Sequence, residues 1–165
     1  MQKSRNELAM ISFSTYVLVA LFAYGGTLAG VGTSILASEE LKSGRVWLAR
    51  SRKIWYVLLI AATLFFLVVS PWSIPVIFLG FLCAYVNKIF VGPMVHVYVG
   101  FLFFLAGRDL AFLLTSAVAV FLFYFTSGAA GMAHGKGDVR KRMKAVLLRH
   151  LPFFACLPLY ALYIF

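Results

Sequence analysis

The sequence predicts an all-α integral membrane protein, a polytopic bundle of about six transmembrane helices that forms a single domain over residues 1–165. The first observation is composition, because 63% of the residues are hydrophobic and only 12% are charged, whereas a soluble domain carries about 25% charged residues. The second is the mean hydropathy of +0.96. The third is that the apolar runs are long enough to cross about 30 Å of hydrocarbon as helices.

The expected helices follow the apolar runs in order along the chain. The first run is long and continues past the length of a signal peptide, so we expect it to stay as a helix. The third and sixth runs are short and flanked by proline, which leaves five spans, or a re-entrant segment near residues 71–75 or 152–158, as alternatives. The six runs cover residues 8–37, 54–70, 74–85, 91–106, 110–131 and 151–165.

Small residues inside these runs indicate how the helices pack. Gly26 and Gly30 have the spacing that lets two membrane helices approach closely, and a backbone opened for a ligand is the alternative. Cys83 and Cys156 both fall inside apolar runs, where a thiol behaves as a small hydrophobic side chain. We therefore expect both cysteines to be unpaired packing residues.

Two basic segments lie between the expected helices and are interpreted as loops. Residues 38–53 carry five Lys or Arg and residues 132–149 carry six, out of fifteen in the chain. Four helices separate the two segments, so both lie on one side, which the positive-inside rule makes cytoplasmic. Both termini are then outside. Orientation alone accounts for this charge, but such segments also attract anionic lipid headgroups.

The net charge of +10 does not indicate a nucleic-acid-binding protein. A soluble nucleic-acid-binding protein spreads its basic residues over a face, whereas here they are confined to segments between apolar helices. The sequence also has no catalytic or metal-binding motif of a soluble enzyme class. The expected partners are membrane lipids and other membrane subunits, and nucleic acid is excluded.

His96 is the one histidine expected well inside a helix, where a polar group is costly and tends to be functional. It is a candidate ligand for haem, a metal or a quinone. His150 lies at the start of the last expected helix, so the two side chains could be at similar depth. Haem bound by two imidazoles needs both rings to converge on one cofactor plane. The alternative is a hydrogen-bonded histidine at the interface, and we expect no haem.

Carboxylates are scarce, since the chain has five Asp and Glu in total. Glu39, Glu40 and Asp138 lie in the two basic segments and could meet there, whereas Glu7 and Asp109 belong to the other side. Magnesium-dependent phosphate chemistry usually takes one or two carboxylates together with substrate oxygens. Only these three residues are therefore candidates for a magnesium site.

The order of three segments resembles the UbiA superfamily of intramembrane prenyltransferases. "LKSGRVWLARSRKIWYVLLIAATLFFLVVS" is similar to the stretch that follows the family's first Asp-rich loop, and "AYVNKIFVGPMVHVYVGFLFFLAG" is similar to its Tyr and Lys turn and next helix. "GKGDVRK" stands where the family has its second Asp-rich loop. The resemblance covers residues 20–165 and leaves the family's first helix and last two helices without a counterpart.

The family's metal-binding motifs are not preserved. It holds magnesium and a prenyl diphosphate with N-D-x-x-D-x-x-x-D-like and D-x-x-x-D-like motifs, whereas this chain has "SILASEELKSGR" and "MAHGKGDVRKR" at the matching places. Without magnesium, a diphosphate or another anionic headgroup needs direct contacts from basic side chains. The resemblance implies four candidates in the matching segments: Arg45, Lys88, Arg140 and Arg142.

Three functions follow from these observations. The first is a non-catalytic, shortened relative of the prenyltransferases that acts as a subunit of a membrane complex or as a lipid-binding module. Scarce carboxylates and 17% aromatic residues, which supply apolar area for packing, favour it. The second is an active prenyltransferase, with magnesium held by Glu39, Glu40 and Asp138. The third is a small haem or quinone protein that uses His96.

Overall fold

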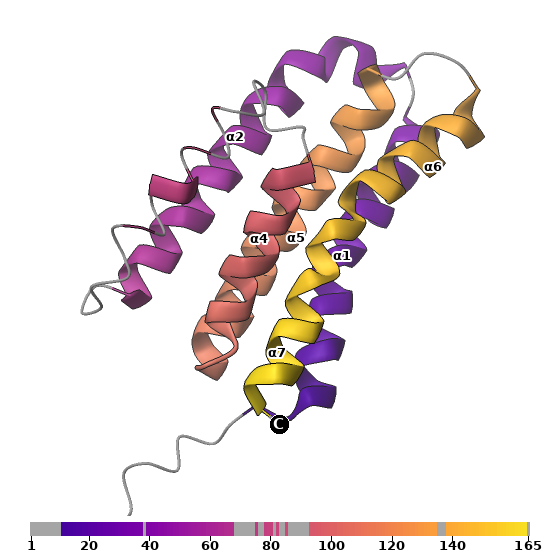
Figure 1. The fold of residues 1–165 in the computed structure, drawn as a ribbon. Coiled ribbons are helices and arrows are strands. Elements are labelled where there is room, and N and C mark those ends of the chain that lie inside the picture. Colours follow the sequence, from indigo (N-terminus) through magenta and orange to yellow (C-terminus); the bar gives the residue numbers. More distant parts are fainter. Residues whose placement is uncertain are drawn as a thin grey trace, which may run out of the picture.

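A computed structural model describes most of the chain, and its regular elements are all helical (Figure 1). The residues it describes are 11–37, 39–67, 75, 78–80, 82, 85, 93–134 and 138–164. Most of the third expected helix, residues 74–85, lies outside them. The elements are α1 (Phe13–Leu36), α2 (Glu40–Leu67), α4 (Pro93–Ala106), α5 (Leu110–His134), α6 (Val139–His150), the 3-10 helix η1 (Leu151–Ala155) and α7 (Cys156–Ile164).

The all-α fold class is confirmed, and within the described residues three helices are long and apolar enough to cross a membrane. They are α1, α5 and the continuous run of α6, η1 and α7, which covers Val139–Ile164. A shorter apolar helix covers Met94–Ala106. Length and hydropathy thus support a membrane protein with several transmembrane helices.

The interpretation of residues 38–53 and 132–149 as loops was wrong, because most of both segments is helical. The second helix begins at Glu40 instead of residue 54, and residues 139–150 form α6. These stretches contain no proline and consist largely of Lys, Arg, Leu, Ala and Met, which have high helix propensity. Hydropathy distinguishes segments that lie in the membrane from segments that lie in water, but it does not distinguish a polar helix from a loop.

Side-chain caps determine where α1 and α5 begin. Ser12 Oγ accepts a hydrogen bond from the Thr15 backbone N–H at 3.2 Å, and Asp109 Oδ1 accepts one from the Phe112 N–H at 2.8 Å. Each cap satisfies a donor that the first turn of a helix leaves unpaired. The turn expected at residues 107–109 is therefore confirmed, and its aspartate has a structural role.

Among the described helices, α1 and α5 form the closest pair, run parallel and meet through glycines. A methyl group added at Gly26 would overlap the carbonyl oxygen of Phe121, and one added at Gly30 would overlap that of Phe125. From the other side, a methyl group on Gly128 would lie 2.8 Å from the Thr27 carbonyl oxygen. The close-packing role expected for Gly26 and Gly30 is confirmed.

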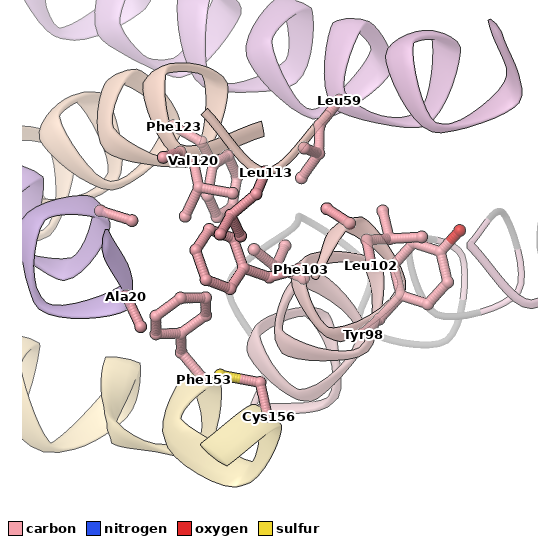
Figure 2. Close-up of a cluster of buried hydrophobic side chains, with 14 of the residues drawn as sticks. Ala20, Leu59, Tyr98, Leu102, Phe103, Leu113, Val120, Phe123, Phe153 and Cys156 are labelled. Carbon is pink, nitrogen blue, oxygen red and sulfur yellow. The ribbon is translucent and has the colours of Figure 1, made fainter. Parts of the chain in front are cut away.

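An aromatic core joins the helices (Figure 2). Side chains from α1, α2, α4, α5, η1 and α7 converge on Phe103, Phe123 and Phe153, which are fully buried. Cys156 lies in this core as an unpaired, buried thiol, as expected, whereas Cys83 lies outside the described residues. Aromatic side chains bury a large area each, so they contribute strongly to the packing of these helices.

The two basic segments lie at the same end of the bundle. Figure 1 shows that α1 and α5 end, and α2 and α6 begin, at the top of the view. Val31, Met132 and Val146 form a buried cluster there, and Leu48 packs nearby with Ala129 and Ala130. We call this part of the molecule, formed by residues 40–53 of α2, 132–134 of α5 and 139–149 of α6, the basic end.

Candidate functional site

The four basic residues expected to bind an anion have different environments. Arg140 is exposed at the start of α6. Arg142 is half-buried, and its Nη1 donates a hydrogen bond to the Met132 carbonyl oxygen at 2.9 Å, so it satisfies an acceptor in the last turn of α5. Arg45 lies on α2 but its side chain is not among those described, and Lys88 lies outside the described residues.

The three expected magnesium ligands are all exposed. Glu39 and Glu40 lie at the start of α2, and Asp138 immediately precedes α6. The Asp138 carboxylate makes no capping hydrogen bond, although a negative charge at this position is favourable for the helix dipole. In the part of the chain that the structure describes, no three His, Cys, Asp or Glu side chains gather where they could hold a metal. A magnesium site stays a prediction.

A pair of buried histidines lies between α4 and the junction of α6 with η1. The ring centroids of His96 and His150 are 4.4 Å apart at an interplanar angle of 50°, and the side chains are 1% and 3% exposed. The two come together because α4 packs along η1, which begins directly after His150. The sequence suggested that His96 and His150 lie at similar depth, and the structure shows that their rings are in direct contact.

The two imidazoles differ in their hydrogen bonding. Nδ1 of His150 and the Thr27 hydroxyl are 3.0 Å apart and share a hydrogen bond whose donor depends on the tautomer. Among the described residues, neither ring nitrogen of His96 has a hydrogen-bond partner, and the same is true of the Tyr124 hydroxyl and Ser127 Oγ. Buried polar atoms without partners are rare and costly, and the hydrogen-bonded interfacial histidine considered as an alternative finds no partner among the described residues.

Aromatic rings form the walls around the histidine pair. The Tyr124 ring stacks on His96 with centroids 5.5 Å apart and lies 5.1 Å from His150. Phe123 lies 6.2 Å from His96, and Phe153 contacts Tyr124 at 5.3 Å. These walls exclude water and provide a low-dielectric surrounding in which electrostatic interactions are strong.

Two arginines place positive charge next to the pair. Arg52 on α2 and Arg149 on α6 both interact electrostatically with His96 and with His150. Arg52 is buried although it lies in the polar first half of α2. Burial and, to a smaller extent, the charge of Arg149 lower the pKa of the Arg52 guanidinium. Together these four residues form what we call the inner site: His96, His150, Arg52 and Arg149.

Sequence reasoning missed Arg52 as a site residue because it treated residues 38–53 as a loop. Helical periodicity would have predicted that Arg52 is buried. Spacings of three and four residues mark one face of a helix, and Arg52 lies on the same face as Leu48, Tyr56 and Leu59, all of which are buried. Nothing in the sequence indicates that Tyr124 would stack on His96, since that contact joins two helices.

Comparisons with known proteins give no independent guide to this site. No protein-family model matches the chain, and neither a curated protein nor a solved structure matches it. The resemblance to the UbiA superfamily therefore stays a hypothesis that rests on the quoted segments alone.

Proposed function

We propose that this chain is a non-catalytic integral membrane protein, related to the UbiA prenyltransferases, that acts as a lipid-binding module or as a subunit of a membrane complex. In this proposal the basic end faces the cytoplasm and contacts anionic headgroups, and both termini face the other side. The observation that carries the proposal is that the two basic segments, far apart in the sequence, share one end of the helical bundle.

The exposed charges at the basic end are suited to a lipid surface. Arg140, Lys141 and Lys144 are exposed on α6, and Arg50 and Lys53 are exposed on α2. Each Lys or Arg near an anionic membrane surface contributes roughly 1 kcal/mol of attraction. The sum over several residues favours lipid binding at this end and also fixes the orientation of the chain.

The outer faces of the helices are suited to lipid tails or partner helices. Large apolar side chains are exposed along these faces, among them Leu18, Leu21 and Phe22 on α1 and Leu114 and Val118 on α5. Exposed apolar faces of this kind are stable when hydrocarbon, and not water, surrounds them. The same surfaces can pack against the helices of another membrane subunit.

The proposal is tested by purifying the protein in mild detergent and incubating it with geranylgeranyl diphosphate and an aromatic acceptor, with and without magnesium. We expect no prenylated product under either condition, and we expect bound anionic lipid to remain in the presence of chelator. Turnover that requires magnesium and is lost in a variant with Glu39, Glu40 and Asp138 changed to Gln, Gln and Asn would establish the enzyme instead.

A further inference from the structure

The inner site contains polar atoms that have no partner among the described residues. His96 is almost fully buried, and within that part of the chain both of its ring nitrogens lack a hydrogen bond, as does the hydroxyl of Tyr124, which stacks on it. Each unpaired buried donor or acceptor costs about 1–3 kcal/mol. Phenylalanine would fill the same aromatic surrounding without that cost, so the imidazole is suited to contact with a polar group other than those of the described residues.

The charges around His96 determine the sign of that group. Arg149 is exposed but directly precedes His150, and Arg52 on α2 is buried. The charges of both act on both imidazoles, and they oppose a cation, most strongly from the buried Arg52, where the effective dielectric constant is low. A metal ion bound by the two histidines would be opposed by both guanidinium groups. An anion would be attracted by them, so the inner site is suited to an anionic ligand.

Hydrogen-bonding capacity narrows the choice of anion. A neutral imidazole offers one donor and one acceptor, and a guanidinium offers several donors in a planar fork that matches oxyanions. A singly protonated phosphate monoester has several acceptor oxygens and one O–H donor, so it can serve both arginines and both sides of the His96 ring. A carboxylate has only two oxygens and no donor.

We propose that the inner site binds the phosphate monoester headgroup of a membrane lipid, with His96 and His150 contacting the phosphate and Arg52 and Arg149 neutralising its charge. This inference rests on the proposed lipid-binding function and specifies its ligand. His150 follows Arg149 directly and ends α6, so one helix end contributes both a ring and a charge.

The aromatic walls favour a lipid over free phosphate. Phe123 and Tyr124 contact the pair, and Phe153 packs against Tyr124. Transfer of an inorganic phosphate into such a place requires loss of its hydration without compensation from apolar contacts. A lipid gains burial of its tail against the helices at the same time. A lipid headgroup and free inorganic phosphate both present a phosphate group to the site, and the binding experiment distinguishes these two ligands.

The test measures binding to the purified full chain in a non-ionic detergent by calorimetry. The probes are dioctanoyl phosphatidic acid, dioctanoyl phosphatidylcholine and inorganic phosphate. We expect phosphatidic acid to bind, phosphatidylcholine not to bind, and inorganic phosphate to bind at least about tenfold more weakly than phosphatidic acid. Equal affinity for phosphatidic acid and inorganic phosphate would overturn the lipid assignment, and absence of phosphatidic acid binding would overturn the whole inference.

Arg149→Gln and His96→Phe test residues of the inner site, and Lys144→Gln is the matched control for the lost charge. Arg149→Gln changes an exposed side chain and should weaken phosphatidic acid binding about tenfold or more, as expected for loss of a charge-assisted hydrogen bond. Lys144→Gln removes the same charge from an exposed position on the same helix and should change affinity by less than about twofold. Equal losses in the two variants would show surface attraction only and would overturn the inner site.

His96→Phe provides a second criterion that does not depend on charge. It should abolish phosphatidic acid binding and raise the unfolding midpoint of the lipid-free protein, because it removes buried polar atoms without partners. Unchanged binding in His96→Phe would overturn the inference. A loss of binding in Arg140→Gln together with wild-type binding in Arg149→Gln would support lipid binding at the basic end and contradict the inner site, whereas magnesium-dependent turnover contradicts only the non-catalytic proposal.

Discussion

At the residue scale, the hydrogen bond between Thr27 and His150 connects α1 to the inner site. Among the described side chains, it is the only hydrogen bond that reaches either imidazole of the pair. Because it orients the His150 ring, it also determines which nitrogen faces His96 and the arginines. The position of Thr27 next to Gly128 shows that this contact depends on the close approach of α1 to α5.

Thr27→Val should destabilise the protein by about 1 kcal/mol, because it keeps the shape of the side chain and leaves Nδ1 of His150 unpaired in the core. Unfolding in mixed detergent micelles measures the change. Thr115→Val is the matched control, since the Thr115 hydroxyl donates only to the Ala111 carbonyl of its own helix and is exposed. Equal effects in the two variants would show that the contact with His150 contributes no stability of its own.

The histidine pair also bears on the haem hypothesis. Two imidazoles that bind one haem iron lie on opposite sides of the porphyrin, whereas the rings of His96 and His150 are in direct contact at 4.4 Å. We therefore expect the purified protein to show no Soret absorption band, and His96→Ala to have the same visible spectrum. A band that disappears in His96→Ala would favour the haem protein over the lipid-binding module.

At the element scale, the apolar helices could be predicted from the sequence and the basic helices could not. The run ending at residue 106 and the run beginning at residue 110 have the boundaries that the structure shows for α4 and α5, because a turn with charged residues separates them. Residues 139–149 were misassigned because their charge suggested a loop. The inner site was only half predictable: His96 stands out as a buried polar residue, but contacts between helices determine its neighbours.

Gly30→Ala and Gly32→Ala form a matched pair on α1. A methyl group at Gly30 would overlap the backbone of α5, whereas one at Gly32 meets open space. We expect Gly30→Ala to cost about 1–3 kcal/mol, as overpacking in a rigid interface does, and Gly32→Ala to be neutral or slightly stabilising, since alanine favours a helix. Thermal unfolding of both variants measures this difference. Equal tolerance of both changes would contradict the close contact of α1 with α5.

At the scale of the whole molecule, the position of the basic segments at one end of the bundle leads to a prediction about the membrane. Single cysteines at Ser43 and Lys141, both exposed, in a chain with Cys83 and Cys156 changed to Ala, should react with an impermeant maleimide only after the cells are opened. This follows from the positive-inside rule. Labelling of one position in intact cells would rule out the shared cytoplasmic side.

The parallel pairing of α1 with α5 has a consequence for biosynthesis. Ser34 on α1 meets Ala129 on α5 across 95 residues of chain, and at about 5–20 residues per second a ribosome needs roughly 5 to 20 seconds to make that length. During this time the glycine face of α1 has entered the bilayer but its permanent neighbour has not been synthesised. The bundle can therefore close only after α5 has been synthesised, and α1 must remain inserted beside lipid or the translocation machinery until then.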